Sequence, residues 1–211
     1  MIHPEMTVDI VNTVASLTVS TGEGWVPEER GTRERLIEAA AELVDEGGPA
    51  AVTLREVGAR AGVSHNAPYR HFADKRDLLA VVAAGSLHDL AGRFRAAEGA
   101  GAERVLRAAL SYLEWAAEHP ARFKLVFGAW GPEPHDELGA AAGAATEAMY
   151  ACVAAAIEDG SLAGDPERVA AMVWALGHGA VDLALSGHLA KRPASPTAED
   201  LVIELIGRLS R

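Results

Sequence analysis

The stretch of sequence that decides the fold is residues 53–76, which read TLREVGARAGVSHNAPYRHFADKR. Thr53 is a favourable helix N-cap, and Glu56 is placed to complete a capping box with it. The helix that follows has one apolar face at helical spacing, made by Leu54, Val57 and Ala61. Gly62 then stands where the chain must reverse, a position that favours the positive φ of glycine. The pattern predicts a short helix that ends in a tight turn.

A second short helix is expected directly after this turn. Val63 is placed to fill the angle between the two helices, and Ser64 to cap the second one. This second helix is expected to continue to about Phe72, through His65, Asn66, Tyr69, Arg70 and His71. Two short helices joined in this way predict a helix-turn-helix, whose second helix lies in the major groove of DNA with its first residues at the base edges.

The same stretch resembles one known family in detail. Ala-Gly-Val-Ser at 61–64, Tyr-Arg-His-Phe at 69–72 and Asp-Lys-Arg-Asp-Leu-Leu at 74–79 closely resemble the DNA-binding domain of the tetracycline-repressor (TetR) family of bacterial regulators. The resemblance covers about residues 32–80. It departs at Pro68, where the family more often has leucine. Proline lacks the N–H that would bond back to the Ser64 carbonyl, which predicts a distorted start of the second helix.

The resemblance implies a role on DNA for individual side chains. The base-reading positions fall on His65, Asn66 and Ala67, where asparagine suits adenine and alanine suits a thymine methyl group. Arg70 is expected at guanine or at a phosphate. The positions expected to contact the phosphate backbone are Tyr69, His71, Lys75, Thr53, Arg55 and Arg33, with Ser64 mainly a cap. For each of them the alternative is a solvated side chain or a helix cap.

The charge of the chain is distributed unevenly. The 211 residues carry a formal net charge of −11, yet residues 30–77 hold eight Lys/Arg and eight Asp/Glu. The remainder holds 11 basic and 22 acidic residues, so the whole deficit lies outside the predicted DNA-binding segment. An acidic body repels DNA and leaves only one face attractive, which orients the encounter. The overall acidity is therefore compatible with DNA binding.

Composition also limits the location and chemistry of the protein. No run of apolar residues approaches the roughly 18 that a membrane-spanning helix needs, and the N-terminus lacks the features of a secretory signal. The single cysteine, Cys152, excludes an intrachain disulfide and fits a reducing cytoplasm. We expect it to be buried, with a thiol sensor as the alternative. No metal site or cofactor is predicted, because the histidines are scattered.

The remaining pattern is helical throughout, so the predicted fold is all-α. Residues 1–31 are predicted to be an N-terminal extension, which is either a mobile arm or the result of a start codon assigned too early. The alternative is a packed or partner-binding segment. Residues 32–80 are the predicted helix-turn-helix domain, whose first helix ends at Gly47-Gly48-Pro49. Residues 81–211 are the predicted regulatory and dimerisation domain. Helices are expected at Asp74–Arg95, Glu103–Glu118, Ala121–Trp130, Asp136–Asp159, Asp165–Ser186 and from Thr197 onward.

A second motif lies in the C-terminal half. Trp174-Ala-Leu-Gly-His178-Gly179, preceded by Phe123-Lys-Leu-Val-Phe127-Gly, resembles the Trp…His-Gly signature of one C-terminal class of these regulators. The hypothesis is an apolar ligand pocket with a few polar groups, lined by Tyr112, Trp115, Phe123, Phe127, Trp130, Met149, Tyr150, Trp174 and His178. The alternative is core packing, with His178 bonded to a backbone carbonyl and with Gly177 and Gly179 allowing close helix approach.

The resemblance implies a ligand-responsive transcriptional regulator, most often a repressor. It also implies a homodimer on a palindromic double-stranded DNA operator, in which a small-molecule effector tilts the linking helix. The last two helices would form the dimer interface through Val173, Leu176, Ala180, Val181, Leu183, Leu201, Val202, Leu205 and Leu209. An enzyme is disfavoured, since no phosphate loop, nucleophile elbow or metal pair occurs. A small-molecule-binding or interaction protein that has lost specific DNA binding remains the alternative.

Overall fold

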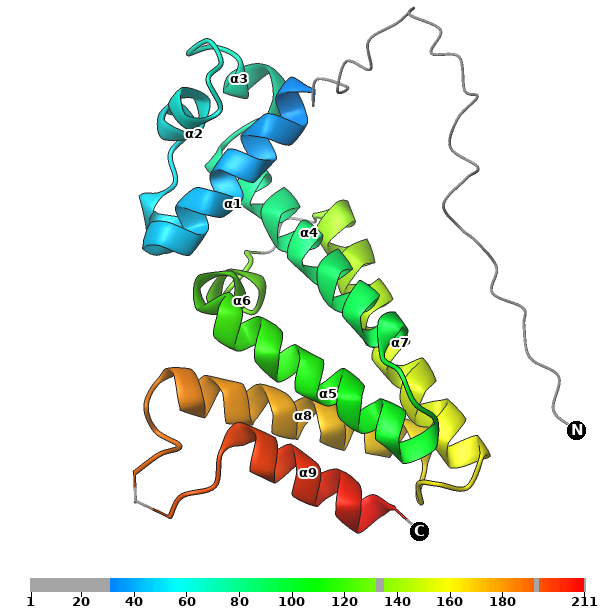
Figure 1. Ribbon diagram of the computed structural model, residues 1–211. Helices are drawn as coiled ribbons and strands as arrows, with labels where there is room; N and C mark the ends of the chain where they lie inside the picture. Colours follow the sequence, from blue (N-terminus) through cyan, green and yellow to red (C-terminus); the bar gives the residue numbers. More distant parts are fainter. Residues whose placement is uncertain (1–30, 132–134, 192–193, 211) are drawn as a thin grey trace, which may run out of the picture. The chain divides into compact units, whose positions relative to one another are not determined.

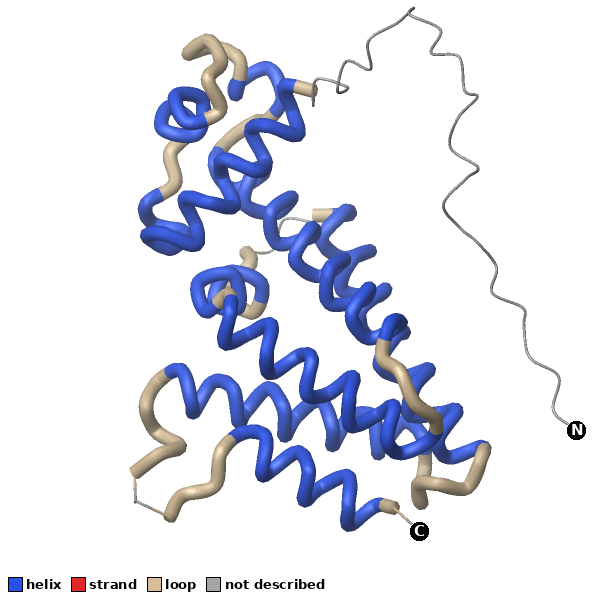
Figure 2. The backbone as a smooth tube through the Cα atoms, viewed as in Figure 1, coloured by secondary structure: helices blue, strands red, loops and turns tan. Residues whose placement is uncertain are grey.

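A computed structural model of the protein describes residues 31–131, 135–191 and 194–210, which form nine helices (Figures 1 and 2). They are α1 (Thr32–Ala51), α2 (Leu54–Arg60), α3 (Pro68–His71), α4 (Lys75–Ala96), α5 (Gly101–Glu118), α6 (Pro120–Val126), α7 (Asp136–Glu158), α8 (Pro166–Leu185) and α9 (Ala198–Leu209). These ranges hold no strand, only an isolated bridge between Leu162 and Ser210. The all-α prediction is confirmed. Residues 1–30 of the predicted extension lie outside the described residues.

The N-terminal helices enclose an apolar core together with the start of α4. Leu36, Ala40, Leu43 and Val44 form a buried apolar stripe on α1, and this stripe meets buried side chains of α2 and α4. The break predicted at the end of α1 is present, but the helix does not end there. The backbone leaves the helix at Gly48 (φ 72°, ψ 178°) and then makes a further turn to Ala51. The core continues without a gap through α9, so the predicted boundary between residues 32–80 and 81–211, which falls inside α4, stays a prediction.

Four helices begin at the polar residue that the sequence predicts. In each, a side-chain oxygen accepts a hydrogen bond from a backbone N–H three residues later: Thr53 from Glu56, Asp74 from Asp77, Asp165 from Arg168, and Thr197 from Asp200. The capping box of α9 is complete, because the Asp200 carboxylate also accepts from the Thr197 N–H. In the described structure of α2 the Glu56 carboxylate forms no such return bond, so half of the predicted box is present.

Helix α6 is shorter than the sequence predicts, because it ends at Val126 and not at Trp130. The Trp130 indole N–H donates to the Val126 carbonyl oxygen at 3.2 Å. This side chain therefore satisfies a carbonyl that the next turn of helix would otherwise bond, and the backbone is free to leave the helix. At Gly128 a Cβ would lie 2.7 Å from the Lys124 carbonyl oxygen, so the departing chain needs a residue without a side chain there.

The second half of the chain surrounds the far end of α4. Helix α4 packs along α7, while α5 contacts α4, α7, α8 and α9 (Figure 1). Much of the apolar surface predicted for the dimer interface is used inside the chain, since Val173, Ala180, Val181 and Val202 are buried. That part of the prediction is wrong, because α5 covers α8 and α9. The large apolar residues that stay exposed on these two helices are Met172, Trp174, Leu183 and Ile203.

Two helices, α7 and α8, are long and apolar enough to cross a membrane by length and composition alone. This differs from the expectation that no segment approaches such a span. The reason is their high alanine content, which raises hydropathy without a continuous run of large apolar residues. Both helices pack against α5 and against each other, as core helices do.

Two glycine-to-alanine substitutions should change stability in opposite directions. Gly62 has φ +64°, and alanine in this left-handed conformation should lower the free energy of unfolding by about 1–2 kcal/mol. Gly85 lies inside α4 with nothing within 4 Å of the position that a Cβ would take, and alanine there should raise that free energy by about 0.5–1 kcal/mol. Urea unfolding followed by circular dichroism measures both. Two changes of the same sign would contradict these backbone assignments.

Candidate nucleic-acid interface

The second helix of the predicted helix-turn-helix begins three residues later than a Ser64 cap requires. Residues 64–67 form a turn in which the Ala67 N–H donates to the Ser64 carbonyl at 2.9 Å, and α3 then starts at Pro68. The prediction of a helix capped by Ser64 is therefore wrong, while the distortion predicted from Pro68 is confirmed. Proline favours the first position of a helix, where its missing N–H removes no intrahelical bond.

Two buried side chains seat α3 on the rest of the domain. Pro68 is buried against Gly58 of α2, where a Cβ would lie 3.0 Å from the proline Cγ. Phe72, directly after α3, is only 3% exposed and belongs to the core. A helix of four residues has little stability of its own. Its position is therefore set by these two anchors.

Arg35 of α1 holds the turn between α2 and α3, a role that the sequence did not reveal. Its guanidinium Nη2 donates to the carbonyl oxygens of Ala61 and Gly62, the latter at 3.4 Å. The contact joins residues 26 and 27 positions apart, so no local pattern announces it. Arg35 thus fixes the turn by a charge-assisted hydrogen bond.

Most residues assigned to DNA contact share one exposed segment. The exposed ones are Thr53, Arg55, Ser64, His65, Asn66, Tyr69, Arg70 and His71. Tyr69 is 56% exposed, unusual for an aromatic side chain, and the His65 ring meets its ring edge-on at 6.1 Å. Ala67 is half-buried in the turn. Lys75 is half-buried as well, with its Nζ donating to the Ala50 carbonyl at 3.4 Å.

Arg33, the cation assigned to α1, is already engaged by the body of the protein. Its guanidinium lies 5.7 Å from the centre of the Phe72 ring, and its Nη2 is 3.6 Å from a carboxylate oxygen of Glu137 on α7. A phosphate contact from Arg33 would therefore compete with this exposed ion pair. The Arg33 side chain therefore connects Phe72, which anchors α3, with Glu137 at the start of α7.

One further cation of the segment is paired away from the exposed face. Arg60 at the end of α2 donates two hydrogen bonds to the Glu46 carboxylate of α1, at 2.5 and 2.8 Å. This pairing lowers the pKa of Glu46, chiefly through the side-chain hydrogen bond. Among the described residues, neither Arg55 nor Arg70 takes part in an ion pair. These two guanidinium groups are available to an incoming polyanion.

The residues of the hypothetical ligand pocket do not line one cavity. Six of them form a packed aromatic cluster that joins α5, α6 and α8: Tyr112, Trp115, Phe123, Phe127, Trp174 and His178. The His178 ring is 4.7 Å from the Phe127 ring and 5.2 Å from the Phe123 ring. Tyr112 packs on Gly177, as expected for a close helix approach, whereas no described atom lies near the missing side chain of Gly179.

The polar atoms of this cluster satisfy each other. The Tyr112 hydroxyl and His178 Nδ1 are hydrogen-bonded at 3.0 Å, so the partner of the histidine is a side chain and not the expected backbone carbonyl. Burial raises the pKa of Tyr112, which keeps its hydroxyl protonated and able to donate. The cluster is therefore a packed set of rings with one internal hydrogen bond, and its Trp174 ring reaches the surface.

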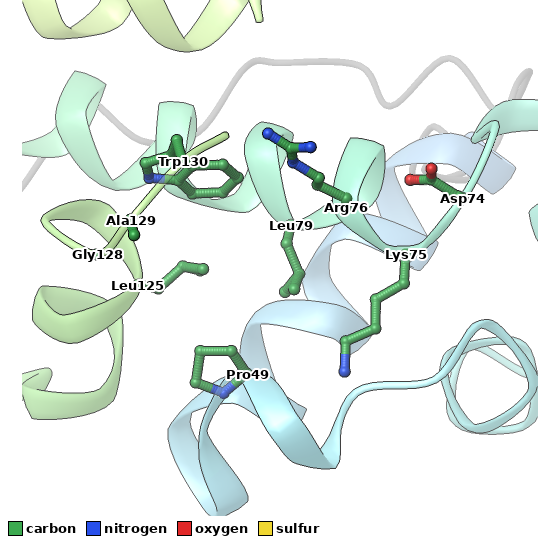
Figure 3. Close-up of a pocket in the computed structure, with 9 residues that line it drawn as sticks. All are labelled: Pro49, Asp74, Lys75, Arg76, Leu79, Leu125, Gly128, Ala129 and Trp130. Atoms are coloured by element: carbon green, nitrogen blue, oxygen red, sulfur yellow. The ribbon is translucent and has the colours of Figure 1, made fainter. Parts of the chain in front are cut away.

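The other pocket residues lie beside separate cavities. Met149, Tyr150 and Trp174 line a cavity of about 200 Å³ between α7 and α8. Trp130 lines two cavities: one of about 330 Å³ between α4, α6 and α7, which Phe127 also lines, and one of about 560 Å³ where α1, α4 and the end of α6 meet (Figure 3). Trp115, Phe123, Tyr112 and His178 line none of these three.

Cys152 is buried, as the sequence predicts. Its thiol donates a weak hydrogen bond to the Phe94 carbonyl at 3.6 Å, and burial raises the pKa of the thiol. A raised pKa keeps the group protonated and unreactive, which disfavours a thiol sensor. In the described part of the chain, no group of three or more His, Cys, Asp and Glu residues is placed to hold a metal ion.

Comparison with known proteins places both halves of the chain in one family. Residues 36–82 match the family model "Bacterial regulatory proteins, tetR family". Residues 105–209 match "Tetracyclin repressor-like, C-terminal domain". The two matches follow each other in the order that the two sequence motifs predict.

Individual relatives agree with this placement. The HTH-type transcriptional repressor KstR2 of Rhodococcus jostii is 34% identical over 95 residues, which are 43% of this chain and 47% of that protein. The HTH-type transcriptional regulator Mb1846 of Mycobacterium bovis is 26% identical over 149 residues, 65% of this chain and 64% of that one. The chain thus spans about half to almost two thirds of these relatives. A Rhodococcus sp. RHA1 protein of unknown function has 26% identity and a TM-score of 0.74, over 88% of this chain and 99% of its own.

The Tyr112–His178 pair predicts a pH dependence of stability. Tyr112 has its pKa raised by burial above the ordinary 10.0, so at high pH the unfolded chain loses this proton before the folded chain does. The contribution is fully present below about pH 10 and is lost as the pH rises further. We expect the Tyr112→Phe variant to lose less stability between pH 9 and 11, in urea titrations, than the wild type. The Tyr69→Phe variant is the exposed control and should behave as wild type; equal slopes for Tyr112→Phe and wild type would refute the assignment.

Proposed function

Because the chain belongs to the tetR family of bacterial regulatory proteins, we propose that it is a ligand-responsive transcriptional repressor that binds a palindromic DNA operator as a homodimer. The observation that carries this proposal is the exposed, polar segment formed by the turn at 64–67 and α3. Buried Pro68 and Phe72 fix that segment in place. Regulators of this family are soluble DNA-binding proteins, and we propose a cytoplasmic location for this one.

The turn at 64–67 is proposed to read bases. His65 and Asn66 are exposed there, at the N-terminal end of α3, which is the end that enters the major groove in a helix-turn-helix. Asn66 offers an amide that suits adenine N6 and N7, and Ala67 offers a methyl group to thymine. Because Pro68 delays the helix, these contacts come from a hydrogen-bonded turn and not from a helical turn.

Phosphate contacts are proposed to surround this segment. Tyr69, Arg70 and His71 are exposed on α3, while Thr53 and Arg55 are exposed at the start of α2. The Thr53 hydroxyl accepts a hydrogen bond within α2 and keeps its own hydrogen to donate. Lys75 and Arg33 are proposed to close the set from α4 and α1, as far as Glu137 releases Arg33. Contacts of this kind set affinity and register and carry no sequence information.

The dimer is proposed to form through the exposed faces of α8 and α9. Met172, Leu176, Gly179 and Leu183 recur at helical spacing along α8, and Ile203 with Gly207 follows the same pattern on α9. Leu183 is 44% exposed and Ile203 49% exposed, and a Cβ at Gly179 or Gly207 would meet open space. Apolar residues beside bare glycines allow the close approach of another helix. A twofold pair would present two reading segments to the two half-sites of a palindrome.

The effector is proposed to bind in the apolar cavity of about 330 Å³ between α4, α6 and α7. Phe127 and Trp130 line it, and they belong to the pocket that the sequence predicts. His135 faces the same cavity, and within the described structure its Nε2 is buried without a hydrogen-bond partner. An unmade bond of this kind is costly, so an apolar effector with one hydrogen-bonding group would be favoured.

A fluorescence-anisotropy titration against the DNA that flanks the protein's own gene tests the function. We expect tight, salt-sensitive binding that random competitor DNA does not remove. Equally weak binding to both DNAs would support the other candidate, a small-molecule-binding protein that has lost specific DNA recognition. The observation that favours this candidate is Pro68, which removes a helical turn from the reading segment.

Two substitutions should separate phosphate contacts from base contacts. Lys75→Gln should weaken binding to all sequences and lower the slope of log affinity against log salt by roughly one unit. Asn66→Ala should cost roughly 1–3 kcal/mol at the operator and relax sequence preference, with little change in the salt slope. Lys124→Gln removes an exposed cation from α6 and serves as the control for charge alone. Identical behaviour of the Lys75 and Asn66 variants would show that the roles are misassigned.

A charge placed on the exposed face of α8 should break the dimer. Leu183→Glu replaces the buried apolar contact expected in the dimer, worth about 1.5–3 kcal/mol, by a charge without a partner. Sedimentation equilibrium should therefore show a dimer for the wild type and a dissociation constant raised roughly a hundredfold for the variant. Ala151→Glu on the exposed side of α7 is the matched control and should remain dimeric. A monomeric wild type at micromolar concentration would rule out the proposed dimer.

A further inference from the structure

The largest of the three cavities lies where the helix-turn-helix meets the rest of the chain. It has a volume of about 560 Å³, within the roughly 300–1,000 Å³ range usual for small-molecule sites. Figure 3 shows its walls, which come from the end of α1, the first turns of α4 and the segment after α6. No residue of the proposed DNA-reading turn lines it, and neither does His135 of the proposed effector cavity.

One part of the cavity is lined by apolar side chains that are fixed by burial or by a hydrogen bond. Leu79 and Leu125 are buried core residues whose side chains reach the cavity, and Pro49 closes it from α1. The indole of Trp130 forms a further wall and is fixed by its hydrogen bond to the Val126 carbonyl. An apolar group that enters would meet preformed surface on several sides. The site therefore requires little ordering of side chains on binding.

Cationic side chains also line the cavity. Lys75 and Arg76, consecutive on α4, both line it and are both half-buried. The Arg76 guanidinium lies against Gly131, where a Cβ would come within 2.7 Å of Nη2, so the bare glycine makes room for it. The one carboxylate in the lining, Asp74, already accepts the Asp77 N–H as the cap of α4. The lining thus holds two cations and the one carboxylate that caps α4, which leaves a formal charge of about +1.

Lys75 is the group best placed to receive an anion. Its Nζ makes a long hydrogen bond of 3.4 Å to the Ala50 carbonyl, whereas an ammonium group has three hydrogens to donate. Because Lys75 is half-buried, an ion pair between its ammonium group and a ligand carboxylate would be stronger than the same pair at a fully exposed lysine. The apolar walls and the ammonium group together define an amphiphilic ligand.

We propose that this cavity binds a small monocarboxylate with an apolar body. The carboxylate pairs with the Lys75 ammonium group beside the end of α1, and the apolar body lies between Leu79, Leu125 and Trp130. The charge of Lys75 selects against neutral amphiphiles of the same size. This site is separate from the effector cavity proposed above.

Ligand binding at this site should also affect the binding of DNA, a consequence that rests on the proposed function. Lys75 is one of the residues proposed to contact a DNA phosphate, and it cannot serve a ligand carboxylate and a phosphate at full strength together. The ligand should therefore weaken operator binding, and by thermodynamic reciprocity the operator should weaken ligand binding by the same factor.

Titration calorimetry of the full chain with sodium decanoate, without DNA, tests the site directly. We expect saturable binding of one decanoate per chain, with affinity at least tenfold lower for decanol and for the Lys75→Gln variant. Ala129→Glu should have the same effect, because Ala129 is an exposed lining residue and the substitution adds a negative charge to the cavity. Ala151→Glu, which adds the same charge on the exposed side of α7, should bind decanoate as the wild type does.

Tryptophan fluorescence locates the bound molecule. Decanoate should change the emission of the wild type and of Trp174→Phe, and this change should be absent in Trp130→Phe. The proposal is overturned if decanoate does not bind saturably, if Ala129→Glu and Lys75→Gln bind it with wild-type affinity, or if the signal survives in Trp130→Phe. Since no DNA is present, a failure of operator binding leaves this result intact. In the DNA titration, decanoate should lower the operator affinity of the wild type but not that of Ala129→Glu.

Discussion

The structure depends on the burial of a single helix, α4, from one end to the other. Its buried residues occur on nearly every side, including Leu78 and Leu79 near its start and Leu90 and Phe94 near its end. Past its first turn, α4 exposes only a stripe at Gly85, His88, Asp89, Gly92, Arg95 and Ala96. The rest of its surface is apolar enough that other elements must cover it. Helix α1 covers its beginning, while α5 and α7 cover its remainder. Even the buried hydroxyl of Ser86 is satisfied within the helix, by donating to the Val82 carbonyl at 3.0 Å. The helices around the start of α4 and those around its end cannot shift independently, because both groups pack against the same helix.

Polar contacts add a second connection beside α4. Arg122 of α6 forms a two-pronged ion pair with Asp45 of α1, at 2.8 and 2.5 Å, and its side chain is only 25% exposed. Such fork-like pairs are directional as well as attractive. Arg33 joins the anchor of α3 to Glu137 on α7 more loosely, at 3.6 Å. A change in the body that moves α6 would therefore pull on α1 through a directional contact, while the weaker α7 contact can open. For the proposed effector, a movement of α6 would therefore reach α1 more directly than a movement of α7.

The sequence predicts what is local and misses what is tertiary. A helix cap involves only the cap residue and the next three, so the sequence alone predicts the four capped starts, at Thr53, Asp74, Asp165 and Thr197. The start of α3 depends on where Pro68 finds a flat surface, and that surface is Gly58, ten residues earlier and on another helix. The end of α6 depends on an indole reaching back to a carbonyl. Five of the aromatic residues predicted as a pocket cluster with His178, whereas Trp130 and Tyr150 lie elsewhere. Periodicity alone cannot distinguish a packed cluster from a cavity. Likewise, the apolar rows of α8 and α9 do not reveal which side α5 covers.

The region around Lys75 differs in charge from the rest of the chain. Outside residues 30–77 the acidic residues outnumber the basic ones by two to one, so that part of the chain carries a net negative charge. Attraction is left to the region where the two charges balance and where Arg60 is already neutralised by Glu46. A DNA phosphate and a small carboxylate are thus steered toward the same end of the molecule. In the two proposals above, DNA contacts the outer face of that end and the carboxylate enters the cavity behind it. Because Lys75 stands between the two, competition there requires no movement of the body, whereas a neutral effector deeper in the fold can act only by shifting α4 or α6.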